Sequence, residues 1–345
     1  MKKIIFGLCV FFICILSVAA ETTDYAPNSK SAILIDAATN TVIFEKNADE
    51  KLAPASMTKI MSMLLIMEAI DRGDISLTDE VTISETASSM GGSQVFLQAG
   101  EVYKVEELLK GIAIASGNDA VVAMAEYVSG SVEEFVSLMN ERAQELGLTN
   151  TVFKNPHGLD AEGHYSSARD MSIMASELIK HEKILEFTSI YEDYLKKNDG
   201  SSVWLVNTNK LVRFYDGVDG LKTGFTETAG YCLTATAKKN NTRFISVVMG
   251  SETSDKRSSD TTSLLNYAFN SYKTQVILKS DDSLGKKRVE NGVKETVDLV
   301  LTKDYVKLLR QNEDAPNYSY NIKVDTLVAP VSYTHLRAHE TDQYR

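Results

Sequence analysis

The chain has 345 residues, of which 43% are hydrophobic, and it carries a formal net charge of −11 at pH 7. That length is enough for a large core and, by the usual size of domains, for about two of them. An acidic chain with no basic stripe and no glycine-rich phosphate-binding loop argues against nucleic acid as a partner.

Residues 1–20 have the features of a secretory signal peptide. A short basic start precedes an apolar run over residues 4–18, and Ala19 and Ala20 are the small residues typical of a cleavage site. We predict cleavage after Ala20 and an exported, extracytoplasmic protein that acts at the cell wall or the outer face of the cytoplasmic membrane. An uncleaved membrane anchor is the alternative.

Cleavage would leave Cys232 as the single cysteine, because Cys9 and Cys14 lie in the signal peptide. One cysteine cannot form an internal disulfide. The apolar neighbours of Cys232 favour a buried structural thiol over a nucleophile.

The pattern from residue 21 to 280 predicts a polar, mobile leader, a hairpin, several helices and then a second group of strands. We expect strands at 31–36, 41–45, 203–206, 231–237 and 243–249 and helices at 56–71, 105–115, from 119, at 132–146, 167–180 and 259–271. Strands at both ends with helices between them predict an α+β domain whose ends meet in an antiparallel sheet flanked by helices.

The hydrophobic pattern of the sequence changes after residue 280. Short, polar, alternating segments without a strong helix predict a small all-β domain at 281–330, which we expect to be incomplete. Residues 331–345 have neither a helical nor a strand period, and we interpret them as a non-native tail. A native disordered tail is the alternative.

A hydroxyl and an amine lie three residues apart at Ser56 and Lys59, on one face of a helix that is apolar nearly all round and must be buried. Burial lowers a lysine pKa, so Lys59 is a candidate base for activating Ser56. The alternative is an ordinary helix-start serine beside an exposed lysine. A second S-x-x-K, at Ser283 and Lys286, lies in a charged run without an apolar helix, which indicates a surface turn.

Two further short motifs follow in order. The S-G-N at 116–118 breaks two apolar helices, and polar groups there cost free energy unless they are hydrogen-bonded or used. The only K-T-G, at 222–224, is expected at a strand end, where Gly224 lets another backbone or a ligand approach closely. Chance explains each motif alone but hardly the ordered set of three.

With these motifs the chain resembles the low-molecular-mass penicillin-binding proteins that act as serine D-alanyl-D-alanine carboxypeptidases, within the serine β-lactamase and penicillin-binding protein superfamily. The resemblance covers about residues 29–280 and includes N-P-H-G-L at 155–159 and Y-S-S-A-R-D at 165–170. It continues more weakly into the second domain, which in the family is all-β.

The resemblance implies catalytic roles for five residues. Ser56 would attack the carbonyl of the penultimate D-alanine to form an acyl-enzyme, and Lys59 would take its proton. Burial and the second cation, Lys222, would lower the pKa of Lys59. Ser116 would relay a proton to the departing D-alanine, and Asn118 would hold Lys59 and a substrate amide.

The resemblance also implies a substrate-binding set of Thr223, Gly224, Phe225 and Arg257. The backbone N–H groups of Ser56 and Phe225 would form the oxyanion hole. Lys222, Thr223 and Arg257 would read the free terminal carboxylate. For Arg257 the alternative is a solvated arginine at the start of a helix.

We predict neither a metal nor a cofactor. His157 and His164 lack zinc-site spacing, and we expect a structural, hydrogen-bonded His157. We expect Asp170 to cap or pin a helix.

The predicted function is removal of terminal D-alanine from peptidoglycan stem peptides, with acylation by β-lactams. A class A β-lactamase is one alternative, although neither Glu162 nor Glu177 is followed four residues later by the asparagine that accompanies the deacylating glutamate. A non-catalytic sensor of β-lactams or wall peptides is the other. The family commonly ends in an amphipathic helix at the membrane surface, and we expect truncation to have removed it here.

Overall fold

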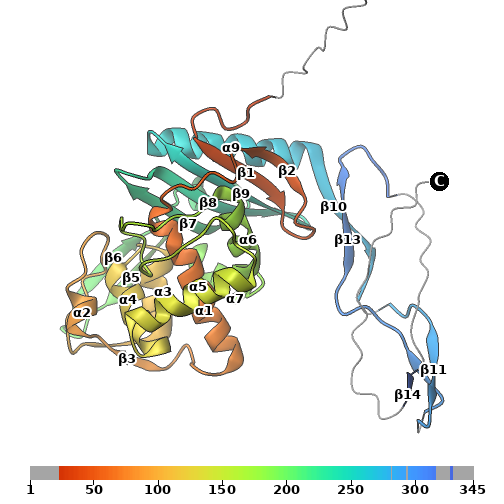
Figure 1. The fold of residues 1–345 in the computed structure, drawn as a ribbon, viewed down its shortest axis with the longest axis horizontal. Coiled ribbons are helices and arrows are strands. Elements are labelled where there is room, and N and C mark those ends of the chain that lie inside the picture. Colours follow the sequence, from red (N-terminus) through yellow and green to blue (C-terminus); the bar gives the residue numbers. More distant parts are fainter. Residues whose placement is uncertain (1–22, 281, 293, 316–326, 329–345) are drawn as a thin grey trace, which may run out of the picture.

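The computed structural model describes residues 23–280, 282–292, 294–315 and 327–328 (Figure 1). The predicted signal peptide at 1–20 and the predicted tail at 331–345 lie outside these residues.

A five-stranded antiparallel sheet organises the main domain, in the order β2-β1-β9-β8-β7. Its strands are β1 (Ser31–Asp36), β2 (Val42–Lys46), β7 (Val218–Thr226), β8 (Gly230–Lys239) and β9 (Thr242–Ser251). The N-terminal hairpin adds to the C-terminal strands through β1 and β9, with Ser31 opposite Met249. The prediction that the two ends of the domain meet in one sheet is therefore confirmed.

Helices cover both faces of this sheet. On one face lies α9 (Ser254–Ser271), and on the other lies a helical layer that includes α1 (Lys59–Arg72) and α6 (Ala168–Leu178) (Figure 1). Strand β1 is buried at every position because Ile33 packs into the core of the helical layer, whereas Leu34 packs into the core under α9. The predicted α+β class, a sheet flanked by helices, is confirmed.

The remaining elements of the main domain are short or lie in the helical layer. They are η1 (Ala55–Thr58), β3 (Glu80–Thr82), α2 (Glu85–Ser88), β4 (Val102–Lys104), α3 (Val105–Ala113), α4 (Asn118–Ser129), α5 (Val132–Glu145), α7 (Lys183–Thr188), β5 (Glu192–Lys196), β6 (Ser202–Val206) and α8 (Leu211–Phe214). The sequence did not predict α2, β4, α7, β5 or α8. Their segments are short and partly exposed, so they carry little periodicity.

The expectation of a mobile leader before β1 is wrong for residues 23–30. Ala26 is fully buried, and the Tyr25 ring stacks on Tyr267 of α9 with 4.0 Å between the ring centroids. Polar side chains suggested a solvated segment, but they hydrogen-bond to the domain instead.

Two predicted boundaries also change. Helix α9 begins at Ser254, five residues before the expected start, because the Thr253 hydroxyl caps it by accepting the Lys256 N–H. The charged residues of its first turn obscure the apolar period, so the sequence placed the start of the helix too late. Arg257 lies inside the helix. The K-T-G lies within β7, which continues to Thr226, and not at the strand end.

The C-terminal part of the chain is all-β, as predicted. Strand β10 (Tyr272–Leu278) pairs with β13 (Tyr305–Arg310), while β11 (Lys286–Glu290) pairs with β12 (Thr296–Asp298) and with β14 (Leu327–Val328). Because β10 pairs with this part and follows α9 directly, we propose that the second domain begins at Tyr272 and not at residue 281.

Candidate active site

Ser56 lies in a single 3₁₀ turn, η1, and Lys59 is the first residue of α1. The first nine residues of α1 are all buried, as the apolar run predicts. Lys59 itself is 0% exposed. The alternative of an exposed lysine is therefore wrong.

The Lys59 ammonium group contacts three neutral acceptors. Its Nζ lies 3.0 Å from Ser56 Oγ, 2.7 Å from Asn118 Oδ1 and 2.8 Å from the His157 carbonyl oxygen. No carboxylate pairs with it in the described part of the chain. Burial lowers the Lys59 pKa well below its ordinary value, and the charge of Lys222 lowers it further, while Asp119 acts in the opposite direction. These surroundings favour the neutral amine, which is the form that can accept the Ser56 proton.

The S-G-N break lies between α3 and α4, as predicted, with α4 beginning at Asn118. Asn118 donates its side-chain N–H to the Gly91 carbonyl and its backbone N–H to the Ser93 carbonyl. Ser116 adopts a left-handed φ of 64°, and its buried hydroxyl has no hydrogen-bond partner among the residues described. The Ser116 hydroxyl is therefore free to bond to a substrate or a water molecule at the break between the two helices.

Strand β7 passes directly against η1 at Gly224. A Cβ added to Gly224 would lie 2.7 Å from the Pro54 carbonyl oxygen and 3.2 Å from the Met57 nitrogen. Only glycine permits this approach, which is the reason the sequence suggested for it. The approach brings the K-T-G and Phe225 beside the Ser56 turn.

Lys222 and Thr223 are both buried next to this approach. Burial and the charge of Arg257 lower the pKa of Lys222 to about 7, and its Nζ contacts only the Thr223 carbonyl among hydrogen-bond partners in the described residues. The Thr223 hydroxyl donates to Thr208 Oγ1 at 2.7 Å. Thr208 lies in no motif and was not predicted. It joins the site because its N–H also binds the Ile114 carbonyl just before the S-G-N.

Arg257 is 4% exposed, so the alternative of a solvated arginine is wrong. Its Nη2 contacts the hydroxyls of Ser254 and Ser258, and its Nε is buried without a partner. No carboxylate pairs with this guanidinium in the described ranges, and burial lowers its pKa. A buried, unpaired arginine near Lys222 forms a cationic pocket suited to an anion.

Phe225 is 52% exposed, and its ring lies against Tyr231 with 4.3 Å between the ring centroids. The side chain thus lies at the solvent-exposed edge of the site, while the backbone of Phe225 lies beside η1.

The two loop histidines are hydrogen-bonded, as expected for His157. The His157 ring accepts the Leu159 N–H, and burial lowers its pKa to about 4. His164 Nδ1 accepts the Lys154 N–H, so Nε2–H donates to Thr58 Oγ1. What the sequence missed is the His157 carbonyl, which binds Lys59.

Three other expectations can be placed. Cys232 is buried, and burial raises the pKa of its thiol to about 11. Asp170 pins the start of α6 to the preceding loop by accepting bonds from the Asn150 N–H and the Thr151 hydroxyl. Within the described residues, no group of three or more His, Cys, Asp or Glu side chains is arranged to hold a metal ion.

Comparison with known families gives two matches. The model of the D-alanyl-D-alanine carboxypeptidase family matches residues 18–253, and that of the penicillin-binding protein 5 C-terminal domain matches residues 272–333.

Individual proteins agree with these families. D-alanyl-D-alanine carboxypeptidase DacF of Bacillus subtilis (strain 168) is 53% identical over 312 residues, which is 90% of this chain and 80% of that protein. DacC of Escherichia coli (strain K12) is 41% identical, over 81% of this chain and 72% of its own.

Solved structures show the same fold. Penicillin binding protein 5 from Haemophilus influenzae aligns with a TM-score of 0.75 at 34% identity, over 88% of this chain and 89% of its own. Penicillin-binding protein D2 from Listeria monocytogenes, in its ampicillin-bound form, aligns at 0.63 and 30% identity, over 70% and 98%. From these matches and the arrangement around Ser56, the chain belongs to the D-alanyl-D-alanine carboxypeptidase family of serine hydrolases.

Proposed function

We propose that this carboxypeptidase removes the terminal D-alanine of peptidoglycan stem peptides through an acyl-enzyme on Ser56. The observation that carries the proposal is the Lys59 amine, buried without a carboxylate partner in the described residues and 3.0 Å from Ser56 Oγ. A serine hydroxyl is a weak nucleophile until a neighbouring base takes its proton. Lys59 is placed to be that base.

In the first step, Ser56 Oγ attacks the carbonyl carbon of the penultimate D-alanine while its proton moves to Lys59. The C–N bond then breaks, and the departing D-alanine amine gains a proton. Ser116 is proposed to relay that proton, because its hydroxyl is buried without a partner in the described residues. Water then attacks the ester carbonyl and releases Ser56.

The negative charge that develops on the carbonyl oxygen needs hydrogen-bond donors fixed in advance. We assign this role to the backbone N–H groups of Ser56 and Phe225. The support is the close approach at Gly224, which places the following residue of β7 beside the 3₁₀ turn.

A free carboxylate on the substrate would lie near Lys222, Thr223 and Arg257. The Arg257 charge lowers the pKa of Lys222, so the two buried cations repel each other. A substrate carboxylate would offset that repulsion and restore the charge on Lys222. An amide at the same place would not, and this difference favours a carboxypeptidase over an endopeptidase.

β-Lactams are proposed to acylate Ser56 in the same way, since the ampicillin-bound relative has this fold. We place the protein outside the cytoplasm, where wall peptides are found. Each helix in the described part of the chain is too short or too polar to span a bilayer. Contact with the membrane surface stays a prediction.

The test is release of D-alanine from a peptide ending in D-Ala-D-Ala, run beside labelling with a fluorescent penicillin. We expect D-alanine release and a label on Ser56. A label without D-alanine release would favour a sensor, and rapid turnover of penicillin would favour a β-lactamase.

A further inference from the structure

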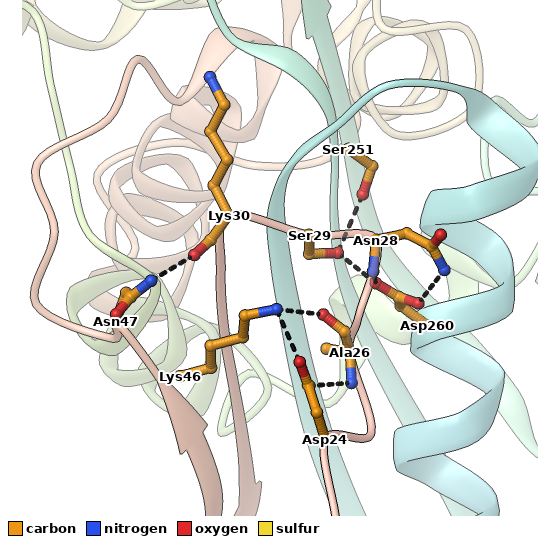
Figure 2. A network of polar contacts seen from close by, with 9 residues as sticks. All are labelled: Asp24, Ala26, Asn28, Ser29, Lys30, Lys46, Asn47, Ser251 and Asp260. Atoms are coloured by element: carbon orange, nitrogen blue, oxygen red, sulfur yellow. Dashed lines mark hydrogen bonds and ion pairs between the residues drawn. The ribbon is translucent and has the colours of Figure 1, made fainter.

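The segment before β1, residues 24–30, is here named the N-terminal strap. Figure 2 shows it lying between the end of β2 and the start of α9. At the β2 side, Lys46 Nζ lies 2.9 Å from both Asp24 Oδ2 and the Ala26 carbonyl oxygen. At the α9 side, the strap contacts Asp260. The strap therefore has polar contacts on two sides, and a side-chain substitution can weaken those on one side without touching those on the other.

Asp260 is a buried carboxylate whose hydrogen-bond donors in the described residues all come from the strap. Its Oδ2 accepts the Asn28 N–H at 2.9 Å and the Ser29 hydroxyl at 2.7 Å, and its Oδ1 accepts the Asn28 side-chain N–H at 2.7 Å. No lysine or arginine of the described chain forms an ion pair with it. A buried charge without such donors is costly, so the strap and α9 hold each other in place.

The same contacts extend to the sheet. The single Ser29 hydroxyl hydrogen is donated to Asp260, so in the 2.9 Å contact with Ser251 it is the Ser251 hydroxyl that donates to Ser29. Ser251 ends β9 and lies opposite Tyr231 of β8, which in turn lies opposite Phe225 of β7. A continuous path of pairs thus joins the strap to the strand that carries the K-T-G (Figure 2 shows its first part).

Arg257 and Asp260 are three positions apart on α9, so Arg257 lies about one helical turn before Asp260. Its own contacts are weak: two serine hydroxyls of the same turn, at 3.1 and 3.4 Å. No carboxylate fixes the guanidinium within the described chain. The position of Arg257 relative to β7 therefore depends on how the first two turns of α9 are held against the sheet, and Asp260 is the polar anchor at that point.

We propose that Asn28 and Ser29, acting through Asp260, are positioning residues for Arg257, and that they set how well the enzyme discriminates a free C-terminal carboxylate. This inference rests on the proposed function, in which Arg257 binds that carboxylate.

The experiment compares two peptides, one ending in D-Ala-D-Ala as the free acid and the other as the C-terminal amide. Release of D-alanine or D-alaninamide gives kcat and KM for each. Arg257→Ala is expected to lower the acid-to-amide preference about 100-fold, as for loss of a charge-assisted pair. The strap variant Asn28→Ala/Ser29→Ala is expected to lower it about 10-fold, with the change in KM for the acid and kcat nearly unchanged.

Combining the variants separates positioning from general stability. The triple variant, with Arg257→Ala added to the strap variant, should be no worse than Arg257→Ala alone, because nothing is left to position. Ser29→Thr keeps the hydroxyl and should keep the preference. Asp24→Asn removes the charge that pairs with Lys46 on the β2 side and leaves every donor to Asp260 in place, so it is the matched control and should behave as wild type.

Thermal unfolding shows whether each variant folds. If the double variant does not, Asn28→Ala alone still leaves two donors on Asp260 and should lower the preference about threefold. The proposal would be overturned if the strap variant kept the wild-type acid-to-amide preference. It would also be overturned if the loss in the triple variant equalled the product of the losses caused by the strap variant and by Arg257→Ala. Wild-type protein that releases neither product would instead contradict the proposed function.

Discussion

The molecule contains the S-x-x-K pattern in two regions that could hardly differ more. At Ser56 and Lys59 the pattern begins a buried helix, and the amine has three protein acceptors. At Ser283 and Lys286 both residues are exposed, and the serine hydroxyl faces Asp298 Oδ1 at 3.2 Å in the second domain. No hydrogen bond joins the second serine to its lysine among those found in the described residues.

The difference teaches that spacing supplies only the pair, whereas burial supplies the chemistry. A lysine in water keeps its proton at neutral pH, so it cannot act as a base. Lys59 can, because desolvation and a second cation act on it together.

Replacing the two serines should give opposite results. Ser56→Ala removes the nucleophile and is expected to lower kcat for D-alanine release by about 10³-fold or more and to abolish penicillin labelling. Ser283→Ala should change neither. Steady-state kinetics and gel fluorescence measure the two effects. Residual labelling of the Ser56 variant would show that another residue is the acylated one.

The two lysines should differ almost as strongly. Lys59→Ala is expected to abolish acylation while leaving the protein folded, because it removes the proposed base. Lys286→Ala, on the surface of β11, should acylate at the wild-type rate. Circular dichroism checks folding in parallel with labelling. Retained labelling in a folded Lys59 variant would contradict its role.

The pH dependence of acylation should follow the protonation of Lys59. Its pKa lies well below the ordinary value of 10.5, so the neutral amine is present where an exposed lysine is charged. Below that lowered pKa, the acylation rate constant should fall about tenfold per pH unit as Lys59 gains its proton. Stopped-flow labelling at saturating penicillin measures it. A rate that appears only near pH 10 would mean that Lys59 behaves like a solvated lysine.

The smallest expected effect is on stability, at Lys222. Its pKa falls from 10.5 when unfolded to about 7 when folded, so between these values the unfolded chain binds the extra proton and stability rises with pH. Lys222→Met should therefore raise the unfolding free energy by about 1 to 3 kcal/mol at pH 6 and by less at pH 10.

Lys286→Met is the control for this measurement and should leave stability unchanged at both pH values, because Lys286 is exposed. Thermal unfolding at pH 6 and pH 10 provides the comparison. A Lys222 variant that is less stable at pH 6 would show that its bond to the Thr223 carbonyl outweighs the cost of burial.

Much of this architecture follows from periodicity and from the three ordered motifs. The burial of α1, the break before α4 and the close approach at Gly224 each reflect a strong local preference, so sequence alone predicted them. The motifs also predicted Ser56 as the nucleophile and Lys59 as its base.

What sequence missed depends on contacts between distant segments. The strap looked like a solvated leader because its polar groups find their partners in Asp260, more than 200 residues away. Thr208 and the His157 carbonyl entered the site for the same reason. The charged first turn of α9 concealed the burial of Arg257, because the pattern at 254–258 is that of a surface loop.

The β5–β6 hairpin has a consequence for spectroscopy. Trp204 is the only tryptophan of the chain, it lies opposite Tyr194 across the hairpin, and it is 59% exposed. The entire indole emission of the protein therefore comes from a partly solvated ring on β6, three residues before Asn207 and on the segment that leads to Thr208. Such a signal will change little when the core unfolds, but it will report on events at the edge of the site that Thr208 helps to build.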